Sequence, residues 1–68
     1  MTNKAKTIRR EFRAALKTQD FWEKQRRNNK RLYTKEYYFA SGQAHAIYEL
    51  AQALNVKLYD ENIKLIED

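Results

Sequence analysis

The chain has no proline and only one glycine, Gly42, so the two residues that most often interrupt a helix are almost absent. Proline lacks the backbone N–H that a helix interior uses, and an interior glycine costs about 1 kcal/mol relative to alanine. Alanine, leucine, lysine, arginine, glutamate and glutamine, which favour helices, are plentiful. The sequence therefore predicts an all-α fold, a helical hairpin or a three-helix unit, with residues 1–68 forming a single small domain.

The size of the chain limits what can stabilise such a fold. A domain of 68 residues buries only about 60% of its unfolded surface, so its core is thin. Disulfides and bound metals often supplement the core of small domains, but this chain has no cysteine and a single histidine, His45. We therefore expect no metal site and no cofactor, and we predict that the protein self-associates as a homo-oligomer.

An amphipathic basic helical segment is predicted over residues 3–31. Asp20, followed three residues later by Glu23, has the pattern of a helix start, so the segment forms either one long helix or two short ones. Asn28 and Asn29 weaken its end because asparagine competes for backbone hydrogen bonds. Its apolar stripe recurs at spacings of three and four and consists of Ile8, Phe12, Ala15, Leu16, Gln19 and Trp22.

A central helix is predicted over residues 34–54. Apolar residues form a seam along this helix, and its other faces are also rather apolar, so the helix needs cover on several sides. We assign the seam to a contact between copies of the chain. The alternative is a small α+β fold in which the aromatic residues near Leu32–Phe39 form a strand. The seam has spacings that alternate between three and four and consists of Tyr37, Ala40, Ala44, Ile47, Ala51 and Leu54.

The last part of the chain is predicted to pack against the helices. Asn55 suits a left-handed helix end, after which Val56 would return apolar surface to the helix. Asp60 suits a helix cap, so a short C-terminal helix is predicted over residues 60–67.

Charge is spread unevenly along the sequence. Residues 1–35 contain twelve Lys and Arg against three acids, whereas residues 36–68 contain two against six. Basic residues of the first segment fall at helical spacing about 200° from the apolar stripe, on the outer face. Such a row can neutralise several phosphates, so we predict a nucleic-acid partner, DNA or RNA, or an acidic protein surface. The candidate nucleic-acid-binding residues are Lys6, Arg10, Arg13, Lys17, Lys24, Arg26, Arg27, Lys30 and Arg31.

The densest part of this row, Lys24–Arg31, resembles the arginine-rich peptides that enter RNA or DNA grooves, although it lacks their longer arginine runs. The resemblance covers eight residues and implies that Arg and Asn side chains here also reach base edges. Trp22 and Tyr33 flank the cluster and are candidates for stacking on unpaired bases. Core packing is the alternative role for these two rings.

No residue pattern in the chain predicts catalysis. His45 stands alone, and a nucleophile would need both a base and an orienting group beside it. We therefore expect a binding protein and not an enzyme. No apolar run approaches the roughly 20 residues of a membrane span, and no secretory signal follows the basic start, so a cytoplasmic location is expected.

Three readings of the function remain open. The first is a small nucleic-acid-binding module that uses the basic face. The second is a protein-binding inhibitor or adaptor that docks on an acidic patch or a nucleic-acid channel, for example an anti-defence factor such as an anti-CRISPR. In size and composition the chain is similar to phage and plasmid accessory proteins. A third reading is a membrane-surface helix with Phe12, Leu16 and Trp22 facing lipid.

Overall fold

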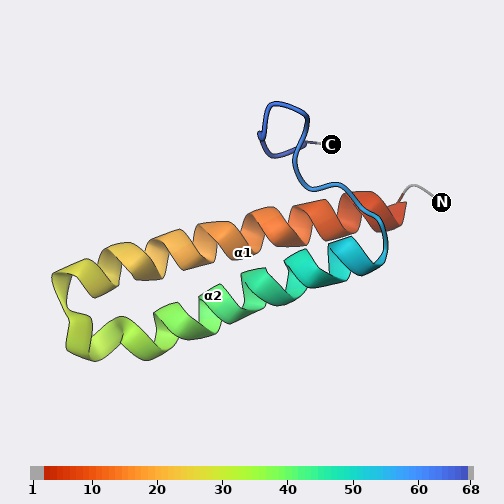
Figure 1. The fold of residues 1–68 in the computed structure, drawn as a ribbon. Coiled ribbons are helices and arrows are strands. Elements are labelled where there is room, and N and C mark those ends of the chain that lie inside the picture. The colour runs from red at the N-terminus through yellow and green to blue at the C-terminus, as the bar shows by residue number, and fades with distance from the viewer. Residues whose placement is uncertain (1–2, 68) are drawn as a thin grey trace.

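The computed structural model describes residues 3–67, without the side chains of Asn3 and Lys30. Two antiparallel helices, α1 (Asn3–Asn28) and α2 (Lys30–Ala53), are followed by a C-terminal segment, residues 54–67, that folds back beside α1 (Figure 1). No strand occurs in the described part, so the predicted all-α hairpin is confirmed. The molecule measures 43 × 21 × 16 Å, and its radius of gyration of 13.5 Å exceeds the roughly 11 Å of a compact domain of this length.

The basic segment forms one continuous helix. Asp20 does not start a second helix, because α1 continues through it, and its carboxylate lies 3.1 Å from the Lys24 ammonium on the next turn. Thr18 stays inside the helix and donates its hydroxyl to the carbonyl of Ala14 at 3.1 Å. The helix ends at Asn28, three residues before the predicted end.

A single residue, Asn29, joins the two helices. Its backbone N–H donates to the Gln25 carbonyl at 3.0 Å, which completes the last turn of α1. Its side-chain oxygen accepts from the Leu32 N–H at 3.4 Å, which caps the start of α2. The central helix thus begins at Lys30 instead of residue 34. The alternative of a strand over Leu32–Phe39 is wrong, because these residues form the first turns of α2.

The core lies between the helices in the half of the hairpin nearer the chain ends. Ala40, Ala44 and Ala51 of the predicted seam are only 2%, 5% and 1% exposed. Their assignment to a contact between copies is therefore wrong, because the chain's own α1 and C-terminal segment already cover them. Small side chains at these positions let the two helices pack closely. The buried cluster consists of Ile8, Phe12, Ala15, Ala44, Ala51 and Leu58, with Leu16, Ile47, Val56 and Leu65 packed against it.

Helix α2 ends as the sequence predicts. Asn55 has a left-handed backbone, with φ of 58°. The Asn55 N–H donates to Gln52 at 3.1 Å and the Val56 N–H donates to Ala51 at 2.8 Å, the two bonds of a Schellman motif. Val56 then packs against the core, so this turn directs the chain back along the hairpin.

The short helix predicted over residues 60–67 does not form. Asp60 caps a tight loop instead, because its Oδ1 accepts from the N–H groups of Asn62 at 2.8 Å and Lys64 at 3.0 Å. A single bridge pairs Tyr59 with Leu65 across this loop. Local hydrogen bonds from a side chain to the backbone compete with helix formation, and here they hold the chain in a tight loop.

Candidate nucleic-acid interface

The outer face of α1 carries three exposed cations of the predicted row, Lys6, Arg10 and Lys17. Lys17 follows Ile8 by nine residues, which at about 100° per residue is half a turn around the helix axis. Ile8 is buried in the core, so Lys17 points away from it. Lys6 and Arg10 share this outer face, and all three side chains are exposed. The face is rigid because α1 runs without interruption beneath it.

The C-terminal segment borders this outer face and uses two arginines of α1. Arg13 Nη1 donates to the carbonyl of Ile66 at 2.9 Å, and Arg13 is half-buried. Arg9 Nε donates to the carbonyl of Lys57 at 2.7 Å. The sequence predicts Arg13 as a binding residue and does not single out Arg9. The sequence places both arginines between the apolar stripe and the outer face, where a C-terminal segment that folds back can contact them.

Acidic neighbours partly neutralise the row beyond Lys17. Lys24 pairs with Asp20 at 3.1 Å, and Arg27 pairs with Glu23 at 3.6 Å. All four side chains are exposed, so each pair is worth at most about 1 kcal/mol and opens readily in water.

Arg26 does not belong to the outer face. It follows Ile8 by 18 residues, which is five full helical turns, so it lies on the inner face toward α2. Its guanidinium stacks over the ring of Tyr37 at 4.9 Å and lies 5.7 Å from the ring centre of Tyr38. Arg26 therefore packs against two tyrosines of α2, on the side of α1 away from Lys6, Arg10 and Lys17.

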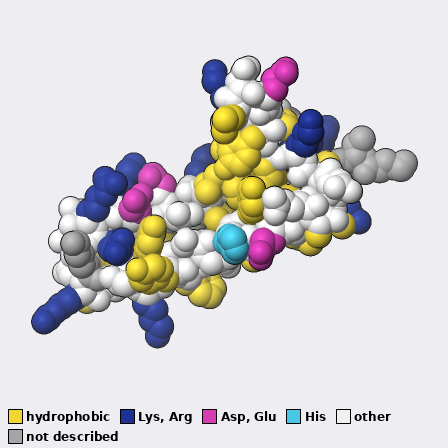
Figure 2. Space-filling view, viewed as in Figure 1, with side chains coloured by type: hydrophobic (Ala, Val, Ile, Leu, Met, Phe, Trp, Pro, Cys, Tyr) yellow, Lys and Arg dark blue, Asp and Glu magenta, His cyan; other side chains and the backbone are white. Residues whose placement is uncertain are grey.

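The remaining predicted cations lie at the turn. Arg31 is exposed, and the side chain of Lys30 lies outside the described residues. Figure 2 shows Lys and Arg side chains gathered around this end of the hairpin, with acidic side chains among them. The stretch Lys24–Arg31 thus spans a helix end and a turn, and its arginines have three different environments. It differs in this respect from the arginine-rich peptides that it resembles in sequence.

The two predicted stacking residues pack against each other. The rings of Trp22 and Tyr33 lie 5.6 Å apart at 33°, and each side chain is half-buried. Phe21 adds an edge-on contact to Trp22 at 5.0 Å. These contacts join α1 to α2 near the turn. Phe12 and Leu16, assigned to lipid in the membrane reading, lie in or against the core instead.

Two further findings concern the part of the chain that the structure describes. Neither helix is both long and apolar enough to cross a membrane. Within residues 3–67, no three His, Cys, Asp or Glu side chains come together as a metal site would require. Comparisons of the chain with models of protein families, with curated proteins and with solved structures find no match.

Proposed function

We propose that the protein binds the phosphate backbone of nucleic acid through the outer face of α1, defined by Lys6, Arg10 and Lys17, and that it has no catalytic role. The observation that supports this most is the exposure of three cations on one side of an unbroken helix, opposite its buried stripe. Helix α1 carries nine Lys and Arg against three acids, so its field attracts anions.

The spacing of these cations suits a polyanion. Lys6 and Lys17 are eleven residues apart, which is about 16 Å along a helix that rises about 1.5 Å per residue. A nucleic-acid duplex presents one negative charge per about 1.7 Å, so several phosphates fall within the reach of this row. Binding releases the counterions that those phosphates hold, and this release provides the driving force.

The proposed contact is independent of base sequence. Phosphate contacts position a protein on nucleic acid but carry no sequence information. The aromatic rings predicted to stack on bases contact each other, and Arg26 is held by two tyrosines. The proposed contact therefore relies on the charge of Lys6, Arg10 and Lys17.

A matched pair of charge reversals tests the proposal. Lys6→Glu with Arg10→Glu reverses two cations on the outer face, and Lys57→Glu with Lys64→Glu makes a similar charge change in the exposed C-terminal segment. Fluorescence anisotropy with a labelled duplex at low salt should show an affinity loss of about a hundredfold for the first pair. The second pair should lose less than about fivefold, because only long-range repulsion changes.

An acidic protein surface is the second candidate partner, and the exposed Tyr and Arg side chains near the turn favour it. This alternative predicts a protein partner that remains bound to the wild-type chain after nuclease treatment. The Lys6→Glu, Arg10→Glu double variant should no longer bind that partner. Wild-type protein that shows no affinity for either DNA or RNA at low salt would overturn the nucleic-acid proposal.

A further inference from the structure

The hairpin has one covered flank and one open flank. Leu16 of α1 faces the C-terminal segment and borders a hollow together with Leu65. Thr18, two residues later and so about 200° around the helix, borders the opposite flank. There, two neighbouring hollows of about 440 and 340 Å³ share Gln43 and form a groove between α1 and α2. In the described structure no segment of the chain covers this groove.

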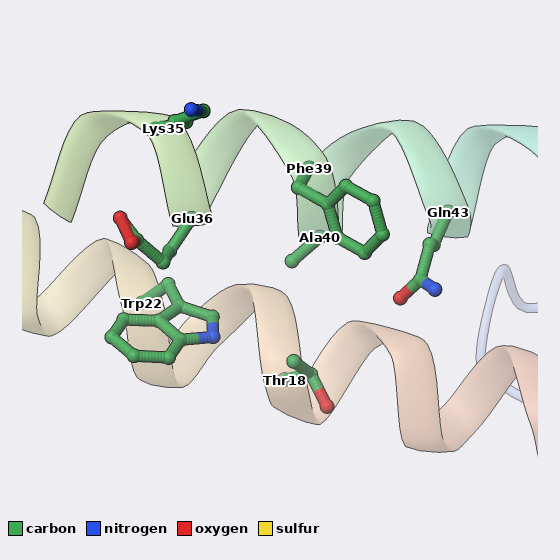
Figure 3. A pocket seen from close by; sticks show the side chains of 7 residues that line it. All are labelled: Thr18, Trp22, Lys35, Glu36, Phe39, Ala40 and Gln43. Atoms are coloured by element: carbon green, nitrogen blue, oxygen red, sulfur yellow. The ribbon is translucent and has the colours of Figure 1, made fainter.

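Large apolar side chains of α2 lie along the open flank. Leu32 and Leu50 are 18 residues apart, five full turns, so they share one line on the helix surface. Phe39 lies near the same line and is 69% exposed, and the two leucines are 61% and 50% exposed. Figure 3 shows Phe39 and Gln43 on α2 and Trp22 and Thr18 on α1 around the groove. Exposed apolar side chains in a row mark a contact surface.

The half of the hairpin near the turn is incompletely packed by the chain alone. None of the described side chains in residues 16–39 is buried. The accessible surface of 5585 Å² exceeds by roughly 1,000 Å² the roughly 4,500 Å² of a compact monomer of 8.2 kDa. A standard interface buries about 800 Å² on each partner, so the surplus is the size of one interface.

We infer that a second copy of this chain packs on the outer face of α2, next to the open flank, with the two α2 helices antiparallel and crossing at Gly42. Gly42 lies nine residues, and so half a turn, from the buried Ala51, which places it on the side of α2 away from α1. A Cβ atom at Gly42 would meet nothing within 4 Å inside the chain, so packing within the hairpin does not require glycine. Glycine in a helix interior destabilises the helix, and a close crossing of two helix axes accounts for its presence there. A two-fold axis at this point makes the surface complementary to itself.

Charge complementarity supports an antiparallel pairing of the two α2 helices that is centred on Gly42. Lys35 lies seven residues before Gly42, and Glu49 lies seven residues after it. In an antiparallel pair centred on Gly42, Lys35 of one copy faces Glu49 of the other, and the symmetry creates this contact twice. Phe39 of one copy then lies beside Ala46 of the other, where the small side chain leaves room for the ring. The contact uses none of Lys6, Arg10 and Lys17, so it stands or falls separately from the proposed function.

Sedimentation equilibrium of the full chain tests the inference. Wild-type protein should have twice the 8.2 kDa mass of one chain at micromolar concentration. Phe39→Glu should raise the dimer Kd by about a hundredfold or more, because it places a charge in the apolar contact. Helix content by circular dichroism should be unchanged, because Phe39 is 69% exposed in the single chain. Phe21→Glu, at a 53% exposed position on another face, is the matched control and should leave the dimer intact.

A charge exchange tests the register. Lys35→Glu alone, or Glu49→Lys alone, should raise the dimer Kd by about threefold to tenfold through two like-charge contacts. The double variant should restore the wild-type Kd. A wild-type monomer at high micromolar concentration, or a dimer insensitive to Phe39→Glu, would overturn the inference. Failure of the double variant to restore the dimer would overturn the antiparallel register.

Discussion

Arg9, Arg10, Arg13 and Arg26 lie on one helix, yet their side chains have different environments. Arg10 is exposed, Arg9 and Arg13 donate to carbonyls of the C-terminal segment, and Arg26 stacks on tyrosines. The difference follows from their angles around α1, since successive residues are about 100° apart. An arginine near the inner face contacts the chain itself, and one on the outer face is exposed.

Arg26→Ala should therefore reduce stability and spare nucleic-acid binding. The variant loses the stacking on Tyr37 and Tyr38 and the packing of the aliphatic stem, together worth about 1–2 kcal/mol. Urea denaturation at a fixed protein concentration measures this loss. Arg10→Ala is the control and should show the reverse pattern, with weaker binding and a stability change below about 0.5 kcal/mol. An Arg26→Ala variant that is as stable as wild type but binds nucleic acid poorly would show that Arg26 contributes to the binding interface.

Ile63 is held in an unfavourable backbone conformation. Its φ is 58°, a left-handed value that a β-branched residue rarely adopts, and its side chain is 81% exposed. Ile63→Gly should raise the free energy of unfolding by about 0.5–1 kcal/mol, because glycine accepts this φ without steric cost. Ile63→Ala keeps the Cβ atom and should gain much less. Equal effects of the two variants in urea denaturation would show that the backbone at Ile63 is not strained.

At the scale of elements, the sequence predicts most of what local patterns control. The apolar period of α1 and the left-handed turn at Asn55 are visible in the sequence, whereas α1 ends three residues before the predicted end. The wrong predictions concern a face or a side chain that can make its contacts in more than one way. The alanine seam looks free for another copy until α1 is placed against it, and Asp60 looks like a helix cap until it closes a loop. A periodic pattern shows that a face is buried but does not identify what buries it.

The alanines between the helices set how closely α1 and α2 pack. Ala51 is 1% exposed, so Ala51→Leu adds three carbons to a filled space and should cost about 1–3 kcal/mol. Ala14→Leu makes the same change on an exposed part of α1 and should alter stability by less than about 0.5 kcal/mol. Thermal unfolding followed by circular dichroism compares the two. Equal melting temperatures would show that the helices do not pack through Ala51.

At the scale of the whole molecule, the C-terminal segment completes a core that two helices alone leave open. Leu58 is 5% exposed and belongs to the buried cluster, and the Ile66 N–H donates to its carbonyl at 3.0 Å. The same segment lies against Arg9 and Arg13. It therefore both stabilises the hairpin and limits the basic surface to the exposed part of the row.

Leu58→Ala should lower stability by about 2–4 kcal/mol, because it opens a cavity where the segment meets the hairpin. Hydrogen exchange should show the largest loss of protection in the segment itself, since its anchor is weakened. Ile63→Ala, at an 81% exposed position of the same segment, controls for the change in side-chain size. A Leu58→Ala variant as stable as wild type would mean that the segment does not pack on the core.

The salt dependence of duplex binding tests the proposed role of the outer face most directly. A contact made by Lys6, Arg10 and Lys17 predicts that log K against log salt has a slope of about −3, at about 0.9 per neutralised phosphate. Replacing Lys6 with Gln should make the slope shallower by about 0.9, and replacing Lys57 with Gln should leave it unchanged. A wild-type slope near zero, or the same slope for both variants, would contradict nucleic-acid binding through α1.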